Sequence, residues 1–337
     1  MVKVAIAGGT SPTLGHSIIK AILATNGRHT PIILSRLKAD SNEPTPSTTL
    51  IANHPVETRY VDYHSQPTLT TALSDIHTVI SVLLSPNPTD WANSQINLFS
   101  ASISAGVKRF APSEFALGTT MHHKAPMDAP KIVVWDAIQQ AIRDTGSPIE
   151  TTRFVCGGFM NYLGIGCPGN EQEALVGFRE RPYLFNIRDG WVEIPLRDDG
   201  GYPRTTMTEI GDVGRFVAAA LDLERWERGE MAMVGEVAGF GEVVRVIEEI
   251  TGRKMRVREV GRAELRREIE GLQPADWVRR MECGYNLVYC DDVDGETALE
   301  GYLNKMCPQI RPVGIREYLE RYWGKGVEGE SAAPAAE

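Results

Sequence analysis

The order of apolar and polar positions predicts alternating strands and helices along the first half of the chain. Residues 2–7 form a short, nearly continuous apolar run, as expected of a strand buried on both faces of a parallel sheet. Further strands are predicted at 31–36, 56–62, 78–83, 107–112 and 149–154, with helices at 17–24, 69–73, 91–105 and 131–144. This alternation is typical of an α/β fold with a doubly wound parallel sheet of Rossmann type.

The alternation fades after residue 155, which predicts a second, smaller α+β part. Strand or hairpin material is expected at 184–195, a strand at 254–260, and helices at 208–223, 240–251, 262–271 and 315–323. Segments 39–55 and 116–130 are interpreted as loops. We therefore expect an α/β domain over 1–155, interwoven with later segments, a second region over 156–324, for which the family resemblance given below implies mainly substrate binding, and a disordered tail over 325–337.

The turn after the first strand is the first candidate site. Gly8 and Gly9 end the strand and Gly15 opens a helix, so backbone N–H groups and a helix N-terminus meet where a pyrophosphate would bind. The residues assigned to this role are Gly8, Gly9, Thr10, Ser11, Thr13, Leu14 and Gly15. The spacing G-x-G-x-x-G is absent, because Ser11-Pro12-Thr13 stands where a central glycine is expected. A tight turn without a ligand remains the alternative.

The end of the second strand indicates which dinucleotide binds. Ser35, Arg36 and Lys38 stand where an acidic residue would hold the 2′-hydroxyl of NAD. A hydroxyl and cations suit a 2′-phosphate instead, which favours NADPH over NADH. A solvated basic turn is the alternative interpretation. Asp62, at the end of the third strand, is predicted to approach the adenine.

Lys131 is the sharpest candidate for chemistry. Steps of 4, 3 and 4 residues from it reach Trp135, Ile138 and Ile142, so Lys131 begins the inward stripe of a helix. Partial burial and the positive end of the helix dipole are expected to lower its pKa, so that it passes a proton near neutral pH. The alternative is a side chain that reaches solvent from the helix start. No tyrosine has a lysine four residues later, which disfavours a Tyr-x-x-x-Lys mechanism.

Two further stretches lie where an open α/β sheet binds ligands. After the fifth strand, Pro112 and Ser113 are assigned to the cofactor and Glu114 and Phe115 to the substrate. After the sixth strand, Phe159 is predicted to cover the nicotinamide, while Met160 and Tyr162 line the substrate pocket. His123 is assigned to the substrate from a loop that overhangs the site. A bend with core aromatics and a solvated histidine are the alternatives.

The composition of the chain excludes several classes of binding partner. The net charge of −9 argues against nucleic acid and anionic membranes, and no apolar run reaches the roughly 18 residues of a membrane span. The five cysteines are odd in number and lack metal-type spacing, which favours buried thiols, a cytoplasmic location and no metal. An immediate strand at the N-terminus leaves no room for a signal peptide. We expect a small-molecule substrate, and a homodimer is compatible with the sequence.

Several motifs together resemble the NmrA-like and isoflavone reductase-like group of atypical short-chain dehydrogenases, of the fungal type. The resemblance spans Val4 to about Trp323, and its carriers are Gly8-Gly9-Thr10 with Gly15, Ser35-Arg36, Val107-Lys108-Arg109-Phe110-Ala111-Pro112-Ser113-Glu114-Phe115, Pro130-Lys131, Gly158-Phe159-Met160-Asn161-Tyr162-Leu163 and Asp212-Val213-Gly214-Arg215-Phe216-Val217-Ala218-Ala219. It implies an NADPH-binding Rossmann domain with a smaller C-terminal substrate domain. It also implies that Lys131 is the catalytic acid/base and that Phe159 lies near the nicotinamide.

The resemblance implies an NADPH-dependent reductase that acts on an enone, ketone, imine or benzylic carbon of a small apolar or aromatic metabolite, in fungal secondary metabolism. Two alternatives stay open: a non-catalytic NADP-sensing regulator, and a redox-neutral isomerase or cyclase that uses the same pocket. A lysine on the inward stripe favours an enzyme over a sensor. The glycine turn departs from the family pattern Gly-Gly-Thr-Gly-x-x-Gly by one extra residue and the missing middle glycine.

Overall fold

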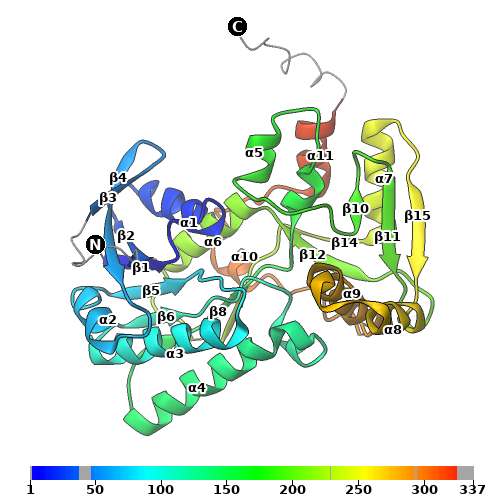
Figure 1. Ribbon diagram of the computed structural model, residues 1–337. Coiled ribbons are helices and arrows are strands. Elements are labelled where there is room, and N and C mark those ends of the chain that lie inside the picture. Colours follow the sequence, from blue (N-terminus) through cyan, green and yellow to red (C-terminus); the bar gives the residue numbers. More distant parts are fainter. Residues whose placement is uncertain (1, 38–46, 228, 293, 325–337) are drawn as a thin grey trace, which may run out of the picture.

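The N-terminal half is built on a parallel sheet (Figure 1), in a computed structural model that describes residues 2–37, 47–227, 229–292 and 294–324. Its strands are β1 (Val2–Ala7), β2 (His29–Arg36), β3 (Ser47–Ile51), β4 (His54–Val61), β5 (Thr78–Ser81), β6 (Arg109–Ala111) and β7 (Glu150–Thr151). They lie in the order β3-β4-β2-β1-β5-β6-β7, and every pair is parallel except β3 with β4. This confirms the predicted Rossmann-type sheet.

Helices cover both faces of the sheet (Figure 1). They are α1 (Leu14–Leu23) and α6 (Ile210–Ala220) on one face, and α2 (Gln66–Ala72), α3 (Pro88–Ser104) and α4 (Ala129–Thr145) on the other. Val4 and Ile6 of β1 pack in the cluster with α1 and α6, whereas Ala5 and Ala7 pack in the cluster with α2 and α3. Both faces of β1 are thus buried, which explains its continuous apolar run.

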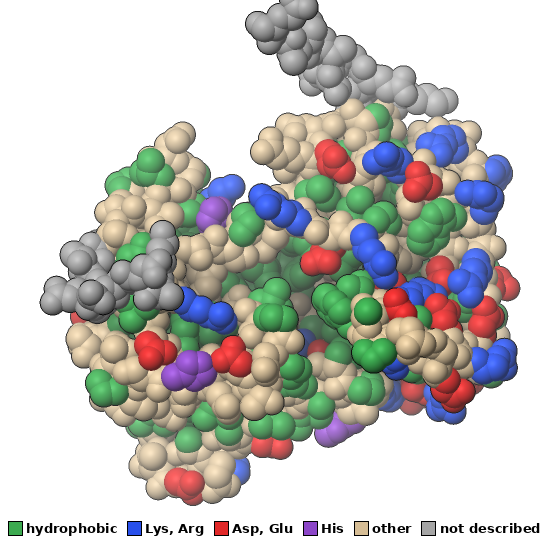
Figure 2. Space-filling view, viewed as in Figure 1, with side chains coloured by type: hydrophobic (Ala, Val, Ile, Leu, Met, Phe, Trp, Pro, Cys, Tyr) green, Lys and Arg blue, Asp and Glu red, His purple; other side chains and the backbone are tan. Residues whose placement is uncertain are grey.

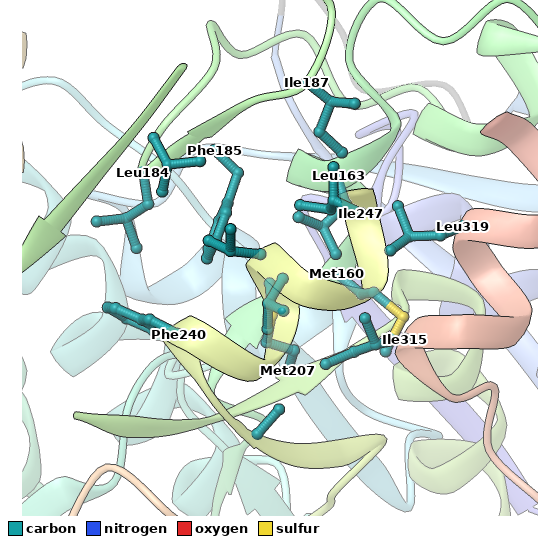
Figure 3. Close-up of a cluster of buried hydrophobic side chains, with 14 of the residues drawn as sticks. Met160, Leu163, Leu184, Phe185, Ile187, Met207, Phe240, Ile247, Ile315 and Leu319 are labelled. Atoms are coloured by element: carbon teal, nitrogen blue, oxygen red, sulfur yellow. The ribbon is translucent and has the colours of Figure 1, made fainter. Parts of the chain in front are cut away.

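The C-terminal half carries smaller sheets and more helices. Its strands are β8 (Arg153–Val155), β9 (Gly158–Phe159), β10 (Phe185–Asn186), β11 (Trp191–Pro195), β12 (Arg204–Thr208), β13 (Glu230–Ala232), β14 (Glu236–Gly239) and β15 (Arg256–Val260). Its helices are η3 (Met160–Gly164), α5 (Glu171–Leu175), α7 (Phe240–Thr251), α8 (Arg262–Gly271), η4 (Pro274–Asp276), α9 (Trp277–Cys290), α10 (Tyr302–Met306) and α11 (Ile315–Trp323). Figure 3 shows its hydrophobic core, in which side chains of α7 and α11 meet Met160 and Leu163 of η3.

The structure differs from the predicted elements in several places, and β12, β13, β14, α5 and α10 were not predicted. Part of the predicted loop 39–55 is the strand β3, which forms a hairpin with β4 because Ala52 and Asn53 adopt the positive φ that a tight turn requires. The predicted loop 116–130 contains two short 3-10 helices, η1 (Thr119–His123) and η2 (Pro126–Asp128). The predicted strand 149–154 is split, since β7 pairs with β6 but β8 pairs with β13. Helix α9 was not predicted.

Helix α6 returns from the second half of the sequence to the first sheet. A Cβ atom at Gly214 of α6 would lie 2.5 Å from the carbonyl oxygen of Ser17 in α1, so the two helices can approach only with glycine at this position. This contact packs a helix from the second half of the chain against the first helix of the N-terminal half. The domain boundary at residue 155 stays a prediction, and both Lys38 and the tail 325–337 lie outside the described residues.

We expect Asn87→Ala to destabilise the protein by about 1 kcal/mol. Asn87 is the N-cap of α3, and its Oδ1 accepts hydrogen bonds from the backbone N–H groups of Thr89 and Asp90. Alanine would leave both donors to water. Urea unfolding would measure the loss, and Asn87→Ser should restore most of it because serine also caps helices. An unchanged midpoint for Asn87→Ala would contradict the capping argument.

Candidate active site

A cavity lies between the two halves of the molecule. Figure 2 shows the surface hollowed there, with hydrophobic side chains on the walls of the hollow. Counted with its open mouth, the cavity holds about 990 Å³. Most of its wall is apolar, and its rings belong to Phe115, Phe159, Tyr162, Tyr183, Phe185, Phe240, Tyr285 and Tyr289. Such an apolar cavity with a few polar groups suits a small aromatic ligand.

Six residues were assigned to the substrate pocket or to the nicotinamide cover, and three of them line this cavity: Phe115, Phe159 and Tyr162. Phe115 adopts a positive φ, which is uncommon for a bulky residue, and its N–H donates to the carbonyl oxygen of Phe154 at 2.8 Å. Backbone strain of this kind concentrates at functional sites. The prediction for Met160 is wrong: its side chain is fully buried among core residues of the C-terminal half (Figure 3). His123 is exposed and is not part of the cavity wall.

Behind the cavity wall, four polar side chains form a buried cluster of charged groups. Lys131 Nζ lies 3.0 Å from Asp128 Oδ1 and 3.4 Å from Glu114 Oε1. His122 Nε2 donates to the same Glu114 oxygen at 2.8 Å. Glu114 and Asp128 are 5 % and 1 % exposed, and the side chain of Lys131 is 15 % exposed. Lys131 therefore does not reach into bulk solvent; it is held as the partner of two buried carboxylates.

The predicted direction of the Lys131 pKa is wrong. Burial alone would lower this pKa, but the charges of Glu114 and Asp128 raise it further than burial lowers it, so the net shift is upward. For Glu114, burial opposes ionisation, yet Lys131 and the hydrogen bond from His122 keep its pKa below the ordinary value. Lys131 is consequently an ammonium at neutral pH. It is suited to donate a proton or to stabilise negative charge, and it is a poor base until its proton has left.

We expect Glu114→Gln to lower the pKa of Lys131, because one of its two carboxylate partners loses its charge. Because its pKa is raised in the folded protein, the Lys131 ammonium stabilises the fold fully below about pH 10, the pKa of lysine in the unfolded chain. This stabilisation is lost as the pH rises through the pKa of Lys131 in the folded protein. The variant should therefore deprotonate at lower pH than the wild type. The rate of Lys131 acetylation against pH, followed by peptide mass spectrometry, would measure this. Glu296→Gln, which removes the partner of Lys124, is the matched control and should leave Lys131 unchanged.

A second hollow lies at the carboxyl ends of β1, β2 and β5. It is lined by the glycine turn, the end of β2 and the residues after β5: Gly8, Thr10, Ser11, Leu34, Ser35, Arg36, Tyr63, Val82, Leu83 and Leu84. The structure thus brings together the glycine turn and the Ser35-Arg36 strand end, as an elongated dinucleotide requires. Arg36 is exposed and has no acidic partner among the described residues, so its guanidinium is available to a phosphate.

The longer glycine turn still closes tightly. A Cβ atom at Gly15 would lie 2.8 Å from the carbonyl oxygen of Gly8, and Gly8 itself has φ +83°. The additional residue is absorbed in the turn, where Ser11 N–H donates to the carbonyl oxygen of Gly8 and the hydroxyls of Ser11 and Thr13 lie 2.9 Å apart. Leu14 then begins α1. The turn therefore accommodates the additional residue while Gly15 remains close to Gly8.

Seven other assigned residues line neither hollow: Gly9, Thr13, Leu14, Gly15, Asp62, Pro112 and Ser113. Asp62 is exposed, and its carboxylate accepts from the N–H of His64, beside the groove residue Tyr63. Pro112 is buried, and Ser113 N–H donates to Gln95 Oε1 at 2.7 Å. Among the described residues no group of three or more His, Cys, Asp or Glu side chains is placed to hold a metal, and the five cysteines are all buried and unpaired.

Comparison with known proteins identifies the family. The profile of the NmrA-like family matches residues 2–319. The chain belongs to the NmrA-like family. A relative, Oxidoreductase BOA1 of Botryotinia fuckeliana (strain B05.10), is 32% identical over 257 residues, which cover 75% of this chain and 77% of the relative.

Solved structures share the fold of this chain. This NmrA-like chain superposes on the structure of pinoresinol-lariciresinol and phenylcoumaran benzylic ether reductases with a TM-score of 0.72 and 20% identity, over 95% of this chain and 99% of the other. It superposes on AtPrR2 with NADP+ and (+)pinoresinol with a TM-score of 0.67 and 19% identity, over 95% and 98% of the two chains. At these identities the likeness shows the fold. No helix among the described residues is long and apolar enough to cross a membrane.

Two parts of the site of this NmrA-like protein were missed by sequence reasoning. Asp128 was unassigned, although an aspartate two residues before Pro130 is a recognisable helix N-cap position. Helix α9 supplies one cavity wall through Val278, Met281 and Tyr285. Their spacing of 3 and 4 residues is a helical stripe that the sequence does contain. The hydrogen bond that joins these two parts, from Tyr285 to Asp128, spans 157 positions of the chain.

Proposed function

We propose that this protein is an NADPH-dependent reductase of a small, largely apolar or aromatic metabolite, with Lys131 as its general acid/base. The observation that carries the proposal is the buried ammonium of Lys131, held by Glu114 and Asp128 directly behind the wall of an aromatic cavity. A protein that only senses NADP needs no such cluster. The relative named as an oxidoreductase and the reductases of similar fold support the same assignment.

The residues at the second hollow fit NADPH. Its pyrophosphate would lie against Gly8, Gly9, Thr10 and Ser11, and its 2′-phosphate against Ser35 and Arg36, with Lys38 next in the sequence. NADP+ in the similar AtPrR2 structure supports this choice of cofactor. When bound, the cofactor supplies a hydride. Phe159, which lines the cavity, is the side chain that would cover the nicotinamide, and the cavity would hold the substrate between Phe159 and Phe115.

The residues of this chain would then handle the proton. Lys131 starts as an ammonium, donates its proton toward the developing negative charge on the substrate, and is charged again from solvent. Glu114 and Asp128 fix its position through the two contacts described above. A substrate such as an enone, ketone, imine or benzylic ether fits this chemistry, and we place the reaction in fungal secondary metabolism, in the cytoplasm. The same acid could serve a redox-neutral isomerisation, which product analysis distinguishes.

The test is NADPH oxidation against a panel of aromatic ketones, enones, imines and benzylic ethers, with products identified by mass spectrometry. We expect consumption of NADPH with one class and a product two hydrogens heavier than its substrate. A product of unchanged mass without NADPH consumption would instead establish the isomerase. NADPH binding without turnover of any compound in a broad metabolite extract would overturn the proposal in favour of a sensor.

A further inference from the structure

The charged cluster behind the cavity connects to the cavity through one side chain. Among the described residues, Tyr285 of α9 is the cavity-lining residue that hydrogen-bonds to this cluster: its hydroxyl donates to Asp128 Oδ1 at 3.3 Å. The same oxygen accepts from Lys131 Nζ at 3.0 Å. Tyr285 therefore stands between the apolar space that would hold a substrate and the ammonium group that would donate a proton.

The hydroxyl of Tyr285 is available to a ligand. Its 3.3 Å bond to Asp128 is longer than the 2.5–3.0 Å that is usual between oxygens, and Lys131 also pairs with that oxygen. A ligand oxygen at the usual distance would therefore compete with this long bond for the O–H group. Burial, and then the charge of Asp128, raise the pKa of Tyr285 well above its ordinary value, so the hydroxyl keeps its proton at neutral pH and remains a donor.

The other cavity tyrosines lack this connection. The hydroxyl of Tyr183 donates to Asn286 Oδ1 at 2.8 Å, a well-formed bond to a buried partner. The hydroxyl of Tyr289 lies 3.4 Å from that of Thr205. The ring of Tyr162 packs edge-on against Phe178 and Tyr183. None of these three tyrosines forms a hydrogen bond with Lys131, Glu114, Asp128 or His122.

Close packing of α9 fixes the position of Tyr285. A Cβ atom at Gly284 would lie 2.3 Å from Cε at the end of the Met127 side chain, so Met127 of η2 packs against α9 at Gly284. The neighbouring residue, Tyr285, is thereby placed with its hydroxyl at the Asp128 carboxylate. Val278 and Met281, on the same face of α9, extend the apolar wall away from this polar point.

We infer that the Tyr285 hydroxyl binds an oxygen atom of the substrate, and that the substrate is an aromatic molecule with a carbonyl or ether oxygen facing Tyr285. The rest of the cavity wall is dominated by rings and aliphatic groups, which would hold the aromatic body. An oxygen bound at Tyr285 would be next to the Asp128 and Lys131 pair, where its developing charge is stabilised. The inference rests on the proposed function, since it names the substrate class for the same cavity.

The test compares two ligands of nearly equal shape, 2-acetylnaphthalene and 2-ethylnaphthalene, of which the first carries a carbonyl oxygen. Their dissociation constants would be measured by quenching of tryptophan fluorescence, with the full-length protein saturated with NADP+. Tyr285→Phe should weaken binding of the ketone about fivefold, the effect of one neutral hydrogen bond, and change hydrocarbon binding less than about twofold. Tyr202→Phe is the matched control, because it removes a hydroxyl that donates to Glu259 and does not line the cavity, and it should change neither ligand by more than about twofold. Tyr289→Phe and Tyr162→Phe ask whether another hydroxyl of the cavity wall binds the oxygen instead. Thermal melting would verify that each variant is folded.

Other outcomes would overturn the inference. Equal loss of both ligands in Tyr285→Phe would mean that the ring fills space and the hydroxyl binds nothing. A selective loss of the ketone in Tyr162→Phe or Tyr289→Phe, with Tyr285→Phe unchanged, would assign the oxygen to another tyrosine. A wild type that binds both ligands equally would reject an oxygen site while leaving the aromatic reductase proposal standing. A wild type that binds neither would reject the aromatic cavity, and the inference with it.

Discussion

Lys131→Ala should lower turnover by roughly 10²–10⁴-fold, the usual scale of general acid–base catalysis. The ammonium lies in a buried pair with Glu114 and Asp128, and alanine would remove the proton donor and leave the two carboxylates without their cation. NADPH affinity should change much less, because the glycine turn and Arg36 line a different hollow. Steady-state kinetics on the substrate found by the NADPH screen, with calorimetric titration of NADPH, would measure both effects.

Two variants separate proton donation from a structural role. Lys131→Arg keeps the positive charge but holds its proton at any neutral pH, so it should not restore turnover. Lys124→Ala is the matched control, because Lys124 is also part of an ion pair, with Glu296, on the segment that precedes α4. It should retain near wild-type turnover. An active Lys131→Arg together with an alanine variant that is less stable but catalytically normal would show that Lys131 only holds the buried carboxylates together.

Arg36→Asp should reverse the cofactor preference from NADPH to NADH. Arg36 is exposed at the end of β2 and lines the groove with Ser35, where the 2′-phosphate is expected. Loss of one charge-assisted contact, worth about 1.5–3 kcal/mol, weakens NADPH by roughly tenfold to a hundredfold, and the new carboxylate repels the phosphate further. The same carboxylate can accept from the 2′-hydroxyl of NADH, which should bind more tightly.

Calorimetric titration of both cofactors into wild type and variant would test this preference. Arg143→Asp is a suitable control, because Arg143 is an exposed arginine on α4 that pairs with Gln140 and does not line the groove. It should leave both affinities within about twofold. Equal or tighter NADH binding by the wild type would remove the argument, since no 2′-phosphate contact would then be needed.

The pattern of apolar residues predicted secondary structure correctly wherever burial of a single segment decides its structure. The apolar run of β1 and the stripes of α7 and α11 were placed correctly because continuous or periodic burial leaves its period in the sequence. Two helix ends were also predicted correctly. Gly106 and Gly146 follow α3 and α4 with φ of +76° and +63°, the left-handed conformation in which glycine often ends a helix. The edge strand β3 was missed because its exposed threonines and serine resemble a polar loop until β4 pairs with it.

The sequence by itself therefore determined the Rossmann-type sheet, the position of the glycine turn, Arg36 beside it, and Lys131 at the start of a helix. Only the tertiary structure decided how Lys131 is charged, because Glu114 and Asp128 oppose the effects of burial and reverse the expected shift. It also decided that Met160 faces the core and that Tyr285 faces the cavity. Tyr285 and Asp128 are separated by 157 positions, and no local pattern encodes a contact that arises when α9 packs on η2. The electrostatic interactions and contacts of a site depend on distances in space. The spacing of apolar residues in the sequence indicates only which face of one segment is buried.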